Sequence, residues 1–83
     1  MSINYNLLRS LTARELITAL IKDDFYLRNQ RGSHQRYRNS DGRRVTVSFH
    51  KTSDNFPPKT LKTIIEDQAR WTEYDVKKMG LIK

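Results

Sequence analysis

Two glycine turns divide the middle of the chain into three strand-like stretches, and this arrangement restricts the possible folds more than any other feature. An Arg-Gly pair ends at Gly32 and an Asp-Gly pair ends at Gly42. Glycine adopts the positive φ angles that tight turns between antiparallel strands require. Polar and apolar side chains alternate in residues 25–30, 33–38 and 44–50, which is the period of a β-strand. We therefore expect three consecutive strands in an antiparallel meander.

The alternation also assigns side chains to the two faces of this sheet. Tyr37, Val45, Val47 and Phe49 are predicted to face a hydrophobic core. The opposite face should then gather a polar and basic set of residues. This set comprises His34, Arg36, Arg38, Thr46, Ser48 and His50.

Helical patterns lie on both sides of the strands. Thr12 and Glu15 have the spacing of a capping box, and this first helix is predicted to end at Asp23 and Asp24. Its apolar stripe comprises Leu16, Ile17, Leu20 and Ile21. Pro58 suits the first turn of a second helix, whose apolar stripe comprises Leu61, Ile64, Ile65 and Ala69.

A third, short helix is predicted after residue 71. Thr72 and Asp75 repeat the spacing of a capping box, and Gly80 ends the helix. The apolar residues expected to pack it against the core are Trp71, Tyr74, Val76, Met79 and Leu81. The predicted fold class is α+β, with a three-stranded antiparallel sheet covered by helices on one face.

Length and composition point to one small domain over residues 1–83. A chain of this size buries a shallow core, so a polymer lying across the surface is a more plausible ligand than a small molecule in a deep pocket. The sequence contains no cysteine, which favours the reducing cytoplasm. We expect neither a membrane span nor a signal peptide, since no apolar run is long enough for a span and the first residues lack the apolar core of a signal peptide.

Positive charge is concentrated in the strand region. The chain has a formal net charge of +7. Residues 25–51 contain seven basic residues and one acidic residue, whereas the rest of the chain contains nine basic and eight acidic residues. Charge focused in this way is typical of a site for a polyanion, and nucleic acid is the first candidate.

His34 is the candidate catalytic residue. An imidazole can accept or donate a proton near neutral pH, and the arginines around it could bind phosphates. Under this interpretation His34 acts as general acid or base in RNA cleavage. The alternative is a surface histidine beside a solvated basic hairpin.

Further residues are candidates for the same site, each with a simpler alternative. Ser33 could position His34 or a phosphate oxygen, or only close the turn. His50 could be a second acid or base, or cap a turn at the strand end. Lys59 could bind an anion near a helix N-terminus, or be a solvated lysine. The arginines expected to bind RNA are Arg28, Arg31, Arg36 and Arg38. No spacing of histidines or carboxylates predicts a metal site or another cofactor.

The chain resembles the HicA mRNA interferase toxins over roughly residues 12–69. Four stretches carry the resemblance: Thr12-Ala13-Arg14-Glu15-Leu16, Arg31-Gly32-Ser33-His34 followed by Tyr37, Arg44-Val45-Thr46-Val47, and Pro58-Lys59-Thr60-Leu61-Lys62-Thr63-Ile64-Ile65. The resemblance implies an α-β-β-β-α fold like that of double-stranded-RNA-binding domains, with residues 71–83 as an extension. It also implies ribosome-independent mRNA cleavage, a catalytic role for His34, and a HicB-like antitoxin that binds and masks the toxin.

Two departures from the family pattern fall near the strands. Asp24 stands where a glycine often precedes the aromatic residue, and Ser48-Phe49-His50 replaces a proline-containing end of the third strand. Neither departure changes Gly32, Ser33 or His34.

Three functions are compatible with this sequence. The first is an endoribonuclease toxin that uses His34. The second is a non-catalytic nucleic-acid-binding module of the same fold. The third is a small domain whose arginine face binds an acidic protein.

Overall fold

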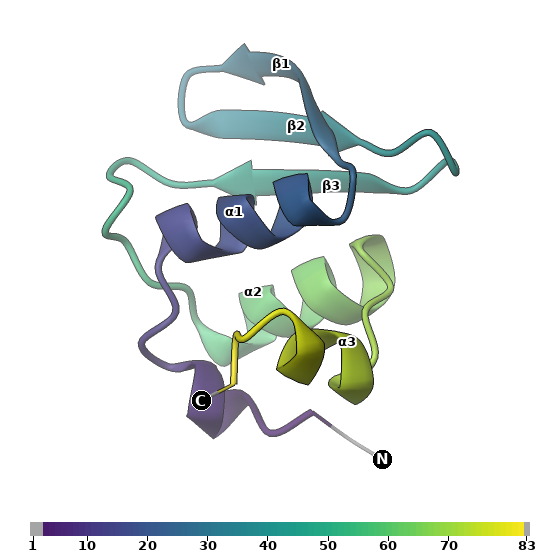
Figure 1. Ribbon diagram of the computed structural model, residues 1–83. Coiled ribbons are helices and arrows are strands. Elements are labelled where there is room, and N and C mark those ends of the chain that lie inside the picture. The colour runs from purple at the N-terminus through teal and green to yellow at the C-terminus, as the bar shows by residue number, and fades with distance from the viewer. Residues whose placement is uncertain (1–2, 83) are drawn as a thin grey trace.

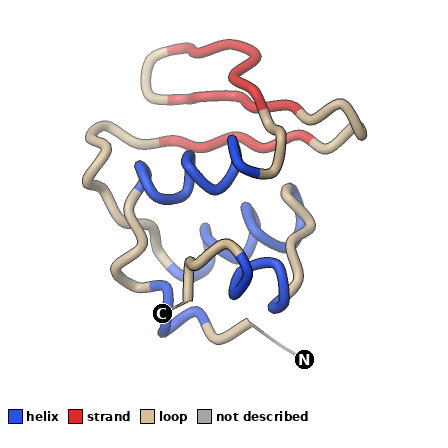
Figure 2. The backbone as a smooth tube through the Cα atoms, viewed as in Figure 1, coloured by secondary structure: helices blue, strands red, loops and turns tan. Residues whose placement is uncertain are grey.

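The computed structural model describes residues 3–82 and contains a three-stranded antiparallel sheet in the order β1, β2, β3. The first two residues and Lys83 of the predicted domain lie outside this described part. Figure 1 shows the helices on the β3 side of the sheet, with β1 farthest from them, and Figure 2 traces the same path by type of element. The elements are η1 (Tyr5–Leu8), α1 (Ala13–Lys22), β1 (Tyr26–Arg31), β2 (His34–Arg38), β3 (Arg44–Ser48), α2 (Pro58–Lys62), η2 (Thr63–Gln68) and α3 (Glu73–Lys78). The predicted α+β class and the short C-terminal helix are confirmed.

Both predicted capping boxes are present. The hydroxyl of Thr12 accepts a hydrogen bond from the amide of Glu15, and the Glu15 carboxylate accepts one from the amide of Thr12. Thr72 and Asp75 make the same reciprocal pair at the start of α3. These side chains satisfy backbone amides that have no partner within a helix, which fixes where each helix begins.

The hydrophobic core lies between the helices and one face of β2 and β3. Tyr37, Val45 and Val47 are buried on that face, as the alternation predicted. From the other elements the core receives Ile3, Leu8, Leu11, Ala13, Leu16, Ala19, Leu20, Phe25, Phe56, Leu61, Ile64, Ile65, Ala69, Trp71 and Val76. None of the six residues of β1 is buried. The helices therefore cover β3 and part of β2, and β1 extends beyond them.

The β1–β2 hairpin turns at Gly32 and Ser33. Arg31 and His34 are the pair that closes the turn, and Gly32 has a φ of +56°, as the first central residue of a type II′ turn does. The prediction placed the turn at Arg31 and Gly32, and began the second strand at Ser33. Both positions were wrong by one residue, because Ser33 occupies the second position of the turn.

A β-bulge at Arg28 determines which side chains of β1 share the face of His34. The pairing passes from Leu27 to Asn29, so Arg28 has no partner residue of its own on β2. A bulge inserts one residue and thereby reverses the alternation beyond it. Arg31 consequently lies beside its partner His34, on the face away from the helices.

The second helix has two backbone patterns where one was predicted. η2 continues α2 as a π-helix, in which the amide of Ala69 donates to the carbonyl of Ile64 over 2.8 Å. The helix ends at Arg70, whose φ is +59°. The predicted apolar stripe is buried nonetheless, and comprises Leu61, Ile64, Ile65 and Ala69.

Two apolar residues that were predicted to pack in the core are exposed. Ile21 is 58% exposed and Tyr74 is 71% exposed. Successive residues of an α-helix differ by about 100° in direction, so Ile21 points away from the core to which Leu20 points. Tyr74 instead has the ammonium group of Lys78 6.0 Å from its ring centroid, which is within the range of a cation–π interaction.

Helix α1 ends in a Schellman motif at Asp24. The amide of Phe25 donates to the carbonyl of Leu20 over 2.9 Å, and Asp24 has a φ of +65°. Glycine adopts this left-handed conformation without a steric cost from Cβ. The backbone thus accounts for the glycine that the resembling family often has at this position.

Across residues 3–82, the structure contains no helix long and apolar enough to cross a membrane.

We expect Asp24→Gly to raise the free energy of unfolding by about 0.5 kcal/mol, because it removes the strain of a left-handed residue that has a Cβ atom. Urea denaturation would measure the change. Asp24→Ala is the matched control, since it removes the carboxylate and keeps Cβ, and it should not stabilise the protein. Equal stabilisation by both variants would assign the effect to the carboxylate and contradict the backbone explanation.

Candidate nucleic-acid interface on the sheet

The face of the sheet opposite the helices is built from three rows of paired residues. Directly paired residues in antiparallel strands point to the same face. From the β1–β2 turn outward, the rows are Arg31–His34–Ser48, Asn29–Arg36–Thr46 and Tyr26–Arg38–Arg44. We call these nine residues the open face.

His34 lies at one end of the open face, as the first residue of β2. It is exposed, and in the described part of the chain its ring makes no hydrogen bond to another side chain. Ser48 is its pair on β3, and the hydroxyl of Ser48 lies 3.4 Å from that of Ser33. The imidazole and two hydroxyl groups are therefore available to a ligand at the same end of the sheet.

A groove of about 410 Å³ occupies the rest of the open face. Its lining residues are Arg28, Asn29, Arg36, Tyr37, Arg38, Arg44, Val45 and Thr46. Four of these are arginines and none is acidic, so the groove favours an anionic ligand. Three of the predicted RNA-binding arginines meet here, and the fourth, Arg31, lies in the row of His34.

His50, the candidate for a second acid or base, follows the end of β3. Phe49 donates its amide to the carbonyl of Ser33 over 3.1 Å, so His50 follows at the same end of the sheet as His34. The amides of His50 and Lys51 both donate to Oδ2 of Asp54 over 3.0 Å. These two hydrogen bonds close the loop after β3.

Lys59 is not part of the open face. It lies in the first turn of α2, which packs against η1, whereas the open face belongs to the sheet. Sequence analysis gave no role to Tyr26, Asn29 and Arg44, which the register brings to the open face. The position of Arg44 follows from the alternation of residues 44–50, in which Val45 faces the core, but the position of Asn29 depends on the bulge. Within residues 3–82 there is no group of three or more metal-ligating side chains.

Arg43 is partly buried, and several groups of the protein bind its guanidinium. Its Nη1 donates to Asp23 Oδ2 over 2.9 Å and to the carbonyl of Ala69 over 2.6 Å, while its Nε donates to Asp41 Oδ2 over 2.8 Å. The guanidinium also lies 4.8 Å from the ring centroid of Phe25. Burial alone would lower the pKa of Arg43, but the two carboxylates raise it, so the group remains charged.

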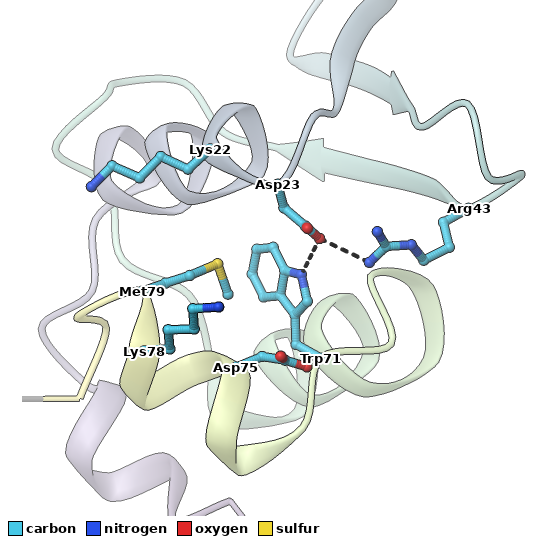
Figure 3. A pocket seen from close by; sticks show the side chains of 7 residues that line it. All are labelled: Lys22, Asp23, Arg43, Trp71, Asp75, Lys78 and Met79. Carbon is cyan, nitrogen blue, oxygen red and sulfur yellow. Dashed lines mark hydrogen bonds and ion pairs between the residues drawn. The ribbon is translucent and has the colours of Figure 1, made fainter.

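Arg43 also lines a second cavity, of about 490 Å³ (Figure 3). Its lining residues are Lys22, Asp23, Arg43, Trp71, Asp75, Lys78 and Met79. The indole Nε1 of Trp71 donates to Asp23 Oδ2 over 2.8 Å, and Figure 3 shows Asp23 between Trp71 and Arg43. The polar side chains in this cavity thus hold the end of α1, the β2–β3 turn and the start of the α3 segment together.

Comparison with protein families matches residues 13–70 to the family described as HicA toxin of bacterial toxin-antitoxin. The match covers more than half of the chain, and it includes α1, the whole sheet, α2 and η2. Comparison with curated proteins gives no match.

We expect Arg43→Ala to lower the free energy of unfolding by about 2–3 kcal/mol, because it leaves the Asp23 carboxylate and the Ala69 carbonyl without their charged donor. Arg44→Ala is the matched control. It removes an exposed arginine from the next position and should change stability by less than about 0.5 kcal/mol. Urea denaturation of both variants would test this, and similar losses would contradict a structural role specific to Arg43.

Acid is expected to weaken the turns on either side of β3. Hydrogen bonds from the backbone of Arg43 lower the pKa of Asp41, and those from Lys51 and His50 lower the pKa of Asp54. A pKa that is lower in the folded state gives stability that is present above about pH 4 and is lost as the pH falls through the folded value. Unfolding measured between pH 7 and pH 2.5 should show this loss, and Asp54→Asn should make it shallower. Parallel profiles for the two proteins would contradict the assignment to Asp54.

Proposed function

The chain belongs to the HicA toxin family of bacterial toxin–antitoxin systems, and from this membership we propose that it is an endoribonuclease that cleaves mRNA with His34 as general acid or base. The observation that carries the proposal is the exposed imidazole of His34 at the end of an arginine-lined face. A toxin of this kind acts on a polymer, and a shallow groove along an open sheet face suits a polymer better than a deep pocket does.

The chemistry requires few protein groups. A base removes the proton of a ribose 2′-OH, and the 2′ oxygen attacks the adjacent phosphorus. The bond from phosphorus to the 5′ oxygen then breaks, and an acid protonates that leaving oxygen. The products are a 2′,3′-cyclic phosphate and a free 5′-OH. His34 can serve at either proton transfer, and general acid–base help of this kind is worth about 10²- to 10⁴-fold in rate.

The groups around His34 have supporting roles in this proposal. The pentacoordinate phosphorane carries extra negative charge, which nearby guanidinium groups stabilise. Arg31 is the pair of His34 in the sheet, and Arg36 occupies the next row. Ser33 can donate a hydrogen bond to a phosphate oxygen, and His50 is the candidate for the second proton transfer. Arg28 and Arg38 bind phosphates farther along the strand, and Lys59 is a candidate for more distant RNA.

The partner in this proposal is a HicB-like antitoxin in the same cytoplasm. Membership of a toxin–antitoxin family implies a partner protein in general. We propose that this partner covers the open face, since masking His34 and its arginines would stop both RNA binding and cleavage. An acidic partner surface would complement the charge of the groove.

We expect His34→Ala to lower RNA cleavage by at least about 100-fold and to abolish growth inhibition on expression in bacteria, because the proton transfers lose their catalyst. His50→Ala tests the second transfer separately. A control RNA with 2′-deoxyribose at the cleaved position should resist the wild-type protein. Binding of RNA by the wild type without cleavage would instead support the non-catalytic nucleic-acid-binding module.

A further inference from the structure

One exposed aromatic residue stands among the arginines of the open face. Tyr26 is 52% exposed and pairs with Arg38, which in turn pairs with Arg44. The catalytic proposal already uses Arg38, but neither it nor the family match gives Tyr26 or Arg44 a role. An aromatic ring displayed on a sheet beside cationic side chains is the arrangement on which unpaired nucleic-acid bases stack.

The row of Tyr26 lies at the opposite end of the open face from His34. Arg38 is four residues from His34 along β2, a separation of about 13 Å at the rise of a β-strand. The groove of about 410 Å³ covers the middle row and extends to Arg38 and Arg44 in the row of Tyr26. A chain that reaches from the ring of Tyr26 to the imidazole of His34 therefore passes over guanidinium groups throughout.

The dimensions of the open face fit a single strand. Five residues of β2 span about 16 Å, and the distance from β1 to β3 is about 10 Å. Modules that read double-stranded RNA by its shape contact roughly 16 base pairs across two minor grooves, which exceeds this surface. The bases of a duplex are also stacked on one another, so they offer no free face to Tyr26.

We infer that the open face binds unpaired RNA, with one base stacked on Tyr26 and the adjoining phosphates held by Arg38 and Arg44. The inference rests on the proposal that RNA is the substrate, and it specifies the class of RNA. Stacking is tolerant of base identity because every base has a π-face. The site therefore selects single-stranded segments rather than one sequence, and it delivers them to His34.

The test measures RNA binding by fluorescence anisotropy in a His34→Ala background, so that no RNA is cut. The probes are an oligouridine of about ten nucleotides and a blunt RNA duplex of about the same length. Tyr26→Leu should weaken oligouridine binding at least about fivefold, and Tyr26→Phe should retain it. Tyr74→Leu is the matched control, because it alters another exposed tyrosine, on α3, and should leave binding unchanged.

Two further measurements complete the test. Arg44→Gln should reduce the slope of log affinity against log salt by about 0.7, the value for one phosphate contact on a single strand. The duplex should bind at least about fivefold more weakly than oligouridine. Equal effects of Tyr26→Leu and Tyr74→Leu, equal affinity for the duplex, or no binding of oligouridine at low salt would each overturn the inference. Failure of the wild type to cleave RNA would refute the catalytic proposal alone, since binding is measured without cleavage.

Discussion

The structure depends on the side chain of one aspartate, Asp23, at the end of α1. Its Oδ2 accepts hydrogen bonds from the guanidinium of Arg43 and the indole of Trp71. Its backbone carbonyl accepts one from the amide nitrogen of the Asn39 side chain over 2.7 Å. Asn39 and Arg43 are joined across the β2–β3 turn, where the amide of Asn39 donates to the carbonyl of Arg43. These hydrogen bonds fix the orientation of the sheet relative to the helices. Their contribution matters because a core of this size gives only a small free energy of unfolding.

Because the helices are anchored to β3, the β1–β2 hairpin at the other edge of the sheet has fewer contacts with them. The helices are tied to β3 and its turns, and β3 is covered further at Thr46, whose amide donates to Oε1 of Gln68 over 2.9 Å. The β1–β2 hairpin receives less of the core and relies on polar contacts of its own. The hydroxyl of Tyr37 donates to Gln35 over 2.7 Å, and the side-chain amide of Gln30 donates to the carbonyl of Gly32 over 3.2 Å. These contacts lead from the edge of the core to the turn that precedes His34.

Features that depend on neighbouring residues were predictable from the sequence, and features that depend on distant contacts were not. The capping boxes at Thr12 and Thr72 and the alternation of β3 were predicted correctly, because each is a local pattern of hydrogen bonding or burial. The bulge at Arg28 was missed because it is defined by pairing with another strand. The exposure of Ile21 was missed for another reason: the predicted apolar stripe of the first helix was too wide, since Ile21 lies about 100° around the helix from Leu20.

The residues of the candidate site also divide into those that a local pattern predicted and those that only the tertiary structure places. Alternation alone assigned His34, Arg36 and Arg38 to one face, and the pairing of β2 with β3 places them there. Lys59 was grouped with them on the basis of its helix position, and it belongs to a part of the structure that packs against η1. The charge count treated Arg43 and Arg44 alike. Only the tertiary structure distinguishes a guanidinium that holds the fold together from its neighbour on the open face.

The stability of the fold and the proposed ligand binding therefore depend on different residues of this small protein. The groups that fix the fold surround Asp23 and the helices, whereas the residues of β1 are all exposed and contribute little to the core. Substitutions at exposed positions usually change stability by less than about 0.5 kcal/mol. Because the basic face contributes little to the stability of the fold, its side chains can vary to suit the RNA or the partner protein that we propose as ligands. The pairing of the three strands then fixes the distances between those side chains, whatever their chemical type.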